Sequence, residues 1–338
     1  MSNNIKKQKT LQRMTTMKNI LVTGGCGFIA SHFINFIFDN DPDINIVNID
    51  AMYYCANENN VRKDIQASQR YKLIKSNLCF INQLEGRVEI LHVLEENKIN
   101  VVVHFAAQSH VQNSFDDSIS YTFDNVLGTH CLLEACRIYD EIEKFIHIST
   151  DEVYGESMLY SQEKKTENSI LSPTNPYAAT KASAELIAKS YYYSFKMPII
   201  ITRGNNVYGP NQYPEKLIPK FIQLLQKGKK VTIQGDGSNV RGFLHVQDVV
   251  KAIDIVLKKG IIGEIYNIGS DEHHEFSVME IAKTLIKKIK NTENYDEHIE
   301  YVEDRPFNDK RYYISNDKMK ELGWNIEIEF LDGLQSLI

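Results

Sequence analysis

Short β-branched runs alternate strictly with longer helical patterns between Ile20 and Thr202. The apolar runs are predicted to be strands buried on both faces: Ile20–Thr23, Ile44–Ile49, Tyr71–Ile74, Val101–Phe105, Phe145–Ser149 and Ile199–Thr202. The segments between them are predicted to be helices: Phe28–Phe38, Glu85–Glu96, Ser118–Tyr139 and Tyr177–Phe195. Because helices that join parallel strands make right-handed crossovers, this order predicts an α/β fold with a doubly wound parallel sheet. Ligands are expected at the carboxyl ends of its strands.

The pattern changes after Thr202, where turn residues become frequent and no comparable set of parallel strands follows. Helices are predicted near Lys216–Lys227, Val246–Lys258 and Val278–Lys288. The sequence therefore predicts a second, smaller α/β domain that is partly interleaved with the first.

Composition limits the partners that the chain can have. Its 338 residues carry a formal net charge of -6, so the clustered Lys and Arg of a general nucleic-acid binder are not expected. No apolar run reaches the roughly 20 residues of a membrane-spanning helix, and residues 1–18 lack the apolar core of a secretory signal. A cytoplasmic protein with no membrane partner is expected. The basic, acid-free residues 1–17 are interpreted as a flexible leader, with a transit peptide as the alternative.

The cysteine and histidine residues do not suggest a metal site. The five cysteines include no C-x-x-C pair, which is typical of reduced thiols in the cytosol. The ten histidines are scattered, and the adjacent pair His273 and His274 is interpreted as part of a surface loop. No metal is predicted.

A glycine-rich turn follows the first predicted strand. The segment Gly24–Ala30 reads G-G-C-G-F-I-A and opens a predicted helix. Glycines at this place let backbone amides approach a pyrophosphate, and the helix N-terminus supplies partial positive charge. The second strand is followed by Asp50, whose carboxylate can accept both ribose hydroxyls of an adenosine. Together these features predict NAD binding and favour NAD over NADP. Asn77, after the third strand, is a candidate for the adenine edge, and a plain turn residue is the alternative.

Two further groups of polar residues follow the strand and helix pattern. Tyr177 and Lys181 are four residues apart at the start of a predicted helix, so they share a face. Lowering a phenol pKa from about 10 by about three units requires roughly 4 kcal/mol of phenolate stabilisation, which the ammonium of Lys181 and a nicotinamide cation could supply. Thr150, Asp151 and Glu152 follow the fifth strand. Adjacent carboxyls removed from water are expected to divide into one acid and one carboxylate.

These motifs together resemble the extended short-chain dehydrogenase/reductases, and among them the nucleotide-sugar 4,6-dehydratases. The resemblance extends from Lys18 to Trp324. It implies a leader at residues 1–17, an NAD-binding Rossmann domain at 18–202 to which 241–269 return, and a nucleotide-sugar-binding domain at 203–240 and 270–338. It implies a lyase in which Tyr177, with Lys181, takes the proton of the sugar C4 hydroxyl, oriented by Thr150, while hydride passes to NAD. Glu152 then removes the C5 proton, Asp151 protonates the departing C6 hydroxyl, and hydride returns to C6.

The resemblance also implies the remaining site residues. The expected NAD-binding positions are Gly24, Gly27, Phe28, Ile29, Asp50, Asn77, Leu78, Ala106, Ala107, Tyr177 and Lys181. The expected substrate-binding positions are Ser109, His110, Asn206, Lys216, Leu217, Arg241, Asn267 and Arg305. Of these, Arg241 and Arg305 are expected to clamp the diphosphate, because a guanidinium can engage two oxygens at once.

Departures from the bacterial dTDP-glucose enzymes bear on the substrate. Their R-P-G-H-D segment is here R-P-F-N-D at residues 305–309, which is similar to the UDP-glucose 4,6-dehydratase half of plant rhamnose synthases and to stand-alone viral enzymes of that type. UDP-glucose is therefore the expected substrate. dTDP-glucose is the alternative, since one methyl group gives only about 1 to 3 kcal/mol of discrimination. A UDP-sugar 4-epimerase is less favoured, because such enzymes usually carry small uncharged residues where this chain has Asp151 and Glu152. A non-catalytic NAD-binding protein is also less favoured, because such a protein would not need the five polar residues Thr150, Asp151, Glu152, Tyr177 and Lys181 together.

The resemblance finally predicts partners. Family members pair two long helices of each subunit, and Ser118–Tyr139 and Tyr177–Phe195 match those positions, so a homodimer is expected. The chain has no second reductase module after Trp324, so a separate epimerase/reductase is expected to use the product in rhamnose or other deoxysugar synthesis.

Overall fold

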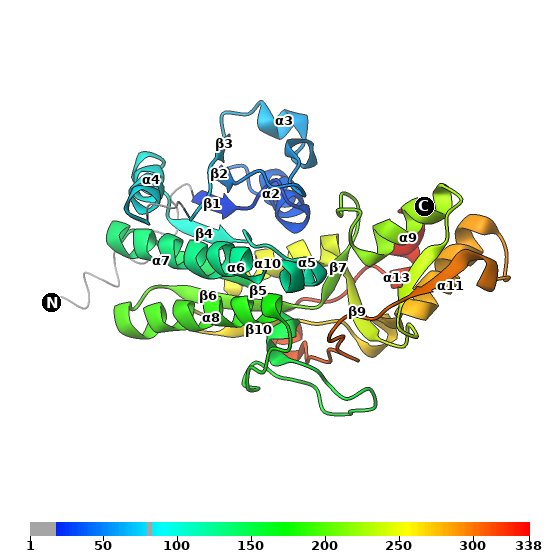
Figure 1. Cartoon of the computed structure of the whole chain (residues 1–338). Helices are drawn as coiled ribbons and strands as arrows, with labels where there is room; N and C mark the ends of the chain where they lie inside the picture. The colour runs from blue at the N-terminus through cyan, green and yellow to red at the C-terminus, as the bar shows by residue number, and fades with distance from the viewer. Residues whose placement is uncertain (1–17, 80–82) are drawn as a thin grey trace.

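A parallel sheet of seven strands forms the centre of the computed structural model, which describes residues 18–79 and 83–338 (Figure 1). The strand order is β10-β6-β5-β4-β1-β2-β3, and every neighbouring pair is parallel. The strands are β1 Asn19–Thr23, β2 Asn45–Asp50, β3 Tyr71–Lys75, β4 Val101–His104, β5 Lys144–Thr150, β6 Ile199–Gly204 and β10 Ile265–Ile268. The predicted doubly wound parallel sheet is confirmed. The predicted leader at residues 1–17 lies outside the described residues.

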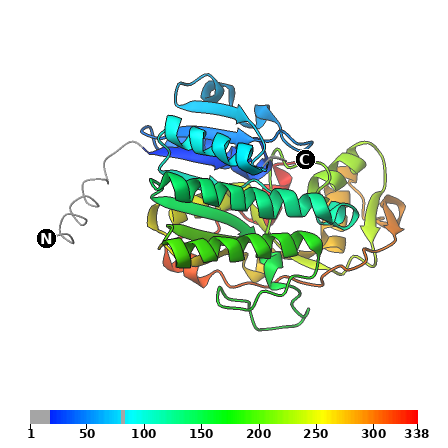
Figure 2. The same ribbon diagram turned by 60° about the vertical axis from the view of Figure 1, so that its left-hand side comes forward.

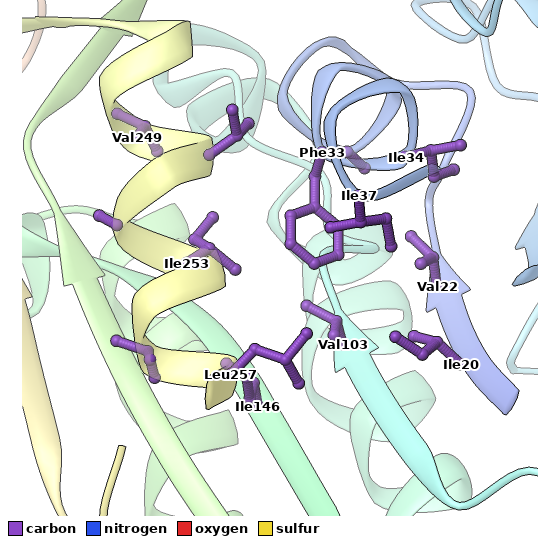
Figure 3. Close-up of a cluster of buried hydrophobic side chains, with 14 of the residues drawn as sticks. Ile20, Val22, Phe33, Ile34, Ile37, Val103, Ile146, Val249, Ile253 and Leu257 are labelled. Carbon is purple, nitrogen blue, oxygen red and sulfur yellow. The ribbon is translucent and has the colours of Figure 1, made fainter. Parts of the chain in front are cut away.

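Helices cover both faces of this sheet. On one face lie α2 (Phe28–Asn40) and α10 (Val246–Lys259), which contact each other. Figure 3 shows their apolar side chains, among them Phe33 and Ile253, turned toward the strands. On the other face lie α4 (Gln83–Glu96), α7 (Gly128–Tyr139) and α8 (Pro176–Phe195), which run side by side in Figure 2. Fully burying a side chain such as Phe33 contributes about 1.5–3 kcal/mol to the stability of the fold. The two layers of buried apolar side chains therefore hold the sheet, and with it the ends of its strands, in place.

Two details of the sheet and its helices differ from the prediction. Strand β3 is half-buried or exposed along its length, so the prediction that it is buried on both faces was wrong. It is an edge strand and pairs only with β2. The predicted helix Ser118–Tyr139 is divided into α6 (Ser118–Tyr121), a π-helical stretch η3 (Thr122–Leu127) and α7. Such π turns often occur at functional sites.

The rest of the chain forms a smaller unit, on the right in Figure 1. One small sheet joins β7 (Asn206–Tyr208), β9 (Val240–His245) and β11 (Glu275–Ser277), and another joins β8 (Val231–Gln234) and β12 (Ile299–Val302). The helices α9 (Leu217–Gln226), α11 (Val278–Lys290) and α13 (Phe330–Gln335) enclose an apolar cluster with these strands. The predicted helices near α9, α10 and α11 are confirmed. Their short partner strands were not predicted, because three to six residues give too little periodicity.

Short helices connect these elements. They are η2 (Glu58–Asn60), α3 (Lys63–Gln66), α5 (Val111–Asp116), η4 (Asp151–Tyr154), η5 (Glu272–His274), η6 (Asp296–His298) and α12 (Asp317–Glu321). Within residues 18–79 and 83–338, none of the helices has both the length and the apolar character needed to cross a lipid bilayer.

Candidate active site

The glycine-rich turn joins β1 to α2 at the centre of the sheet, where the strand order reverses between β1 and β4. Gly24 has a φ of 70°, and a Cβ there would lie 2.9 Å from the Cα of Ala106. A Cβ on Gly25 would lie 2.3 Å from Oδ1 of Asn48. Gly24 therefore requires glycine, and a side chain at Gly25 would have to displace the buried Asn48 amide. Gly27 caps α2 without a side-chain hydrogen bond, so the first amides of α2, at Phe28 and Ile29, are available to an anion.

Asp50 lies beside this turn at the end of β2. Its carboxylate accepts hydrogen bonds from the backbone N–H groups of Cys26 (2.8 Å) and Met52 (2.8 Å). Burial raises the pKa of Asp50, and these two N–H groups oppose that shift. Each carboxylate oxygen keeps a free lone pair for a ribose hydroxyl. The glycine turn thus fits the pyrophosphate of NAD, and Asp50 fits the ribose of its adenosine.

The other expected cofactor residues surround this turn. Ala106 and Ala107 follow β4, and the backbone N–H of Ala106 donates to the Thr23 hydroxyl (3.1 Å). Leu78 is buried after β3. Asn77 is held in place by its neighbours, because its side chain donates to the hydroxyl of Tyr53 (2.7 Å) and accepts from the N–H of Cys79 (2.8 Å). Its role in binding adenine stays a prediction.

The predicted acid pair begins the short helix η4, directly after β5. Thr150 is the N-cap, and its hydroxyl donates to Oδ1 of Asp151 (3.1 Å). The other carboxylate oxygen of Asp151 accepts a hydrogen bond from Nδ2 of Asn205 (2.5 Å). Burial, and then the charge of Glu152, raise the pKa of Asp151 to about 7. Asp151 can therefore hold a proton near neutral pH, as a general acid must.

Glu152 has different hydrogen-bond partners. Nδ2 of Asn175 donates to its Oε2 (3.0 Å), and the Tyr312 hydroxyl lies 3.4 Å from the same oxygen. Burial raises the pKa of Glu152, and the Asn175 hydrogen bond opposes that shift. The Tyr312 hydroxyl donates to Asp309 (2.5 Å). Glu152 is thus held by one oxygen, which leaves Oε1 for another group.

Tyr177 and Lys181 lie on the first turns of α8, where Pro176 and the Asn175 cap start the helix. Both side chains are buried, and Nζ of Lys181 donates to the Ile148 carbonyl (2.7 Å). Burial and then the charge of Glu152 raise the pKa of Tyr177, while the Thr150 hydroxyl opposes the shift. Burial lowers the pKa of Lys181 to about 8. Without a nicotinamide cation the pKa of the phenol is therefore raised, and the lowering expected from Lys181 and that cation together stays a prediction.

Cationic side chains lie close to the acid pair. Arg305 has a buried Nε with no hydrogen-bond partner in the described part of the chain, and burial and then the charge of Arg241 lower its pKa. The guanidinium of Arg241 stacks on the Tyr312 ring, 4.8 Å from its centroid. Nζ of Lys216 donates to the Ser109 carbonyl (2.7 Å). Two neighbouring guanidiniums with an unpaired donor fit an anion with several oxygens, such as a diphosphate.

The remaining expected substrate residues divide into two groups. His110 follows β4, Asn206 begins β7 and Leu217 begins α9. The Lys216–Ser109 hydrogen bond brings the residues next to His110 and Leu217 together. Nδ1 of His110 is buried, and it lies 3.8 Å from the Glu215 carboxylate, too far for a hydrogen bond. Asn267 is not brought to these residues. It is fully buried on β10, and its side chain accepts a hydrogen bond from the Tyr154 hydroxyl (2.8 Å).

Three site residues were not singled out by the sequence analysis. Asn205 holds Asp151, and Tyr312 lies beside Glu152. Asn125, in the π-helical stretch η3, donates to the Gln108 carbonyl (3.0 Å) and to the Thr180 hydroxyl (2.9 Å), which ties η3 to α8. Asn205 follows directly after β6, so the rule that ligands bind at strand ends could have found it. No local pattern distinguishes Asn125 or Tyr312.

Comparisons with known proteins agree with this arrangement. The family model described as GDP-mannose 4,6 dehydratase matches residues 21–337. A trifunctional UDP-glucose 4,6-dehydratase/UDP-4-keto-6-deoxy-D-glucose 3,5-epimerase/UDP-4-keto-L-rhamnose-reductase of Arabidopsis thaliana is 46% identical over 94% of this chain and 46% of its own length. The chain thus spans about half the length of this plant relative. A dTDP-D-glucose 4,6-dehydratase of Homo sapiens is 45% identical over 95% of this chain and 89% of its own length.

Solved structures show the same similarity. The dTDP-glucose 4,6-dehydratase DesIV from Streptomyces venezuelae, with NAD and TYD bound, has a TM-score of 0.86 and 34% identity, over 94% of this chain and 95% of that one. A UDP-glucuronic acid 4-epimerase from Bacillus cereus, with NAD bound, has a TM-score of 0.83 and 30% identity, over 94% of this chain and 96% of that one. The resemblance inferred from the sequence is confirmed. The chain belongs to the GDP-mannose 4,6 dehydratase family, whose members among its relatives are NAD-dependent nucleotide-sugar 4,6-dehydratases.

Proposed function

We propose that this protein is an NAD-dependent UDP-glucose 4,6-dehydratase, which converts UDP-glucose to UDP-4-keto-6-deoxyglucose and water. The observation that carries the proposal is the acid pair Asp151 and Glu152 beside the buried phenol of Tyr177. The fold does not distinguish dehydration from epimerisation, because 4-epimerases also match this chain. Epimerisation needs only oxidation and reduction at C4, whereas loss of water also needs a base at C5 and an acid at O6.

Three side chains, Tyr177, Glu152 and Asp151, each transfer a different proton in this reaction. Bound NAD would accept hydride from C4 and return it to C6. Tyr177 takes the proton of the C4 hydroxyl, and the hydroxyl of Thr150 orients the same group. The resulting C4 ketone makes the C5 hydrogen acidic, and Glu152 removes it as a proton through its free oxygen. Asp151, with its pKa of about 7, donates a proton to the departing C6 hydroxyl, which leaves as water. When hydride is delivered to C6, a proton returns to C5, which completes the 4-keto-6-deoxy sugar.

Arg241 and Arg305 are proposed to bind the diphosphate of the substrate. The unit with the larger sheet is proposed to bind NAD, and the smaller unit is proposed to bind the nucleotide-sugar. The preference for UDP-glucose rests on the R-P-F-N-D segment, in which Asn308 lies beside Arg241 (3.4 Å). Sequence identity alone does not choose between the nucleotides, since the plant and human relatives match almost equally well. dTDP-glucose is the second candidate substrate. The product would go to a separate epimerase/reductase.

Purified protein incubated in parallel with UDP-glucose and dTDP-glucose tests both points. The proposal predicts a 4-keto-6-deoxy product, detected by its absorbance in alkali and by mass, formed with the higher kcat/KM from UDP-glucose. Absence of the keto product from both nucleotides would contradict the dehydratase assignment, and formation of UDP-galactose would identify an epimerase. A higher kcat/KM with dTDP-glucose would make dTDP-glucose the substrate and would leave the dehydratase assignment unchanged.

The substitution Glu152→Gln separates oxidation from elimination. It removes the base at C5 but leaves Tyr177 and Lys181, so we expect product formation to fall by at least about 100-fold. Substrate should still reduce part of the bound NAD, which is visible as near-ultraviolet absorbance. The exposed Glu163→Gln serves as a matched control with unchanged turnover. Loss of both steps in Glu152→Gln would mean that this residue is needed mainly for the structure of the site.

A further inference from the structure

A second cluster of polar side chains lies in the smaller unit and belongs to no part of the proposed reaction. It consists of His273 and His274 in η5 and Glu329, the N-cap residue of α13. One ligand atom from each residue can be chosen so that all three lie within 4.8 Å of one another. Although Glu329 is far from the two histidines in sequence, η5 and α13 both pack against β9, which brings the three side chains together.

His274 is not a surface-loop residue, so that interpretation of the histidine pair was wrong for it. His273 is exposed, but the side chain of His274 is 1% exposed. Neither ring nitrogen of His274 makes a hydrogen bond of full geometry among the described residues, although a backbone group of Ile328 lies close enough to oppose the lowering of its pKa by burial. Leaving a buried polar group unpaired costs about 1–3 kcal/mol, so a buried imidazole that is paired this weakly favours a further partner.

Glu329 is the acid closest to this ring, but it does not satisfy the ring by itself. Its Oε2 lies 3.7 Å from Nε2 of His274, which is longer than a hydrogen bond. The Glu329 side chain is 66% exposed and makes no capping hydrogen bond to α13, so its carboxylate is free to turn toward another group. The His273 ring lies over the His274 ring with 4.2 Å between centroids. The three potential ligands therefore face one small volume.

We propose that His273, His274 and Glu329 bind one divalent transition-metal ion of the Zn²⁺ type. Two imidazole nitrogens and a carboxylate oxygen are ligands that Zn²⁺ prefers. Bond lengths of about 2.0–2.2 Å place ligand atoms about 3.5 Å apart, so the present separations need only small changes of rotamer. Both exposed ligands, His273 and Glu329, can make that change, while the buried His274 stays in place. Water would complete the coordination.

A metal ion at this site would stabilise the fold and would take no part in catalysis. Its ligands join η5 to the N-cap residue of α13, the last helix of the chain. The rings of Phe276 and Phe330, which follow the ligands on β11 and α13, are stacked with 4.2 Å between centroids. A bound ion would therefore stabilise an existing contact between the two segments. Because an ion that binds only the folded state raises its stability, bound metal should raise the melting temperature.

To test this site, the purified protein is first treated with a chelator and dialysed. It is then titrated with Zn²⁺. We expect calorimetry to show one equivalent of Zn²⁺ per chain, and Co²⁺ in its place to give visible d–d absorption. The exposed-residue substitutions His273→Asn and Glu329→Gln should each weaken binding at least about tenfold and remove the zinc-dependent rise in melting temperature. His92→Asn, on the exposed side of α4, is the matched control and should bind like the unaltered protein.

The possible results are distinct from those of the dehydratase assay, because none of these measurements uses nucleotide-sugar. Failure of the unaltered protein to bind one equivalent of Zn²⁺ would overturn the proposal. Equal binding by His273→Asn, Glu329→Gln and the unaltered protein would also overturn it, since zinc would then be held by other histidines or cysteines. Circular dichroism of each variant without metal shows whether a loss of binding reflects a loss of folding.

Discussion

Asp151 and Glu152 are neighbours in sequence, but the protein gives their carboxyl groups different surroundings. Asp151 is almost fully buried and bonded to Asn205 and Thr150, whereas Glu152 accepts a hydrogen bond from Asn175. The sequence predicted a division into one acid and one carboxylate from the adjacency alone. The adjacency did not say which of the two is the acid, because the amide that contacts each carboxylate comes from another part of the chain, and only the family resemblance implied Asp151. The pKa of about 7 supports Asp151 as the acid.

The raised pKa of Asp151 also predicts how stability changes with pH. The folded protein binds this proton more tightly than the unfolded chain, whose ordinary value is 3.8. The stabilising contribution is therefore fully present below about pH 4 and is lost as pH rises through about 7. The free energy of unfolding falls by on the order of 4 kcal/mol over this pH range. Asp151→Asn removes the ionisation, so we expect its melting temperature, relative to the unaltered protein, to be higher at pH 8 than at pH 5.

Thermal unfolding at both pH values measures this difference. Asp296→Asn changes an exposed carboxylate in η6 and should not alter the pH dependence of stability. An Asp151→Asn variant with the same pH dependence as the unaltered protein would show that Asp151 is ionised across this range. That result would remove it as the general acid.

At the scale of elements, α8 carries Tyr177 and Lys181 and is tied to the sheet by a buried ion pair. Glu185 of α8 and Arg203 of β6 are 0% and 1% exposed and form several hydrogen bonds, the shortest 2.6 Å. Arg203 also donates to the Tyr154 hydroxyl (2.7 Å). The pair therefore links the helix of the phenol to the strand that precedes Asn205.

Removing one member of this pair should destabilise the protein strongly. Glu185→Ala leaves the Arg203 charge buried without its partner, for which we expect a loss of about 3–5 kcal/mol in the free energy of unfolding, measured by urea titration. Glu293→Ala removes the partner of Lys287 in an exposed pair and should leave the urea midpoint unchanged. A small effect of Glu185→Ala would mean that water enters and solvates Arg203.

The sequence predicted the larger elements well and the smaller ones poorly. Six of the central strands and the long helices have clear periodicity, because buried β-branched runs and amphipathic helices each leave a strong pattern. The seventh strand, β10, was not predicted as a strand, since the polar Asn267 interrupts the apolar run of Ile265–Ile268. The π turn in η3 was also missed, because it depends on the tertiary hydrogen bonds of Asn125.

At the scale of the whole molecule, α7 and α8 form an outer layer of the structure (Figure 2). Several of their large apolar side chains are exposed: Ile138, Leu186, Tyr193 and Phe195. Leu186 and Tyr193 are seven residues apart and therefore lie on one face of α8. This surface agrees with the homodimer predicted from the resemblance, which stays a prediction.

Light scattering after size exclusion tests the dimer. We expect a mass of twice 38.9 kDa for the unaltered protein and a monomer for Leu186→Asp, because a charge on this face would be buried in the interface. Leu186 is 58% exposed, so the substitution should not disturb folding. Ile261→Asp, in the exposed turn between α10 and β10, is the control and should remain dimeric. A monomeric unaltered protein at micromolar concentration would contradict the expected pairing.

In the proposed reaction one hydrogen moves within the sugar, from C4 to C6, while water is lost between C5 and C6. UDP-glucose labelled with deuterium at C4 tests this directly, with the product analysed by NMR and mass spectrometry. We expect a 4-keto-6-deoxy product that carries the deuterium at C6. Deuterium that stays at C4, in glucose or galactose form, or that is lost to solvent would contradict it.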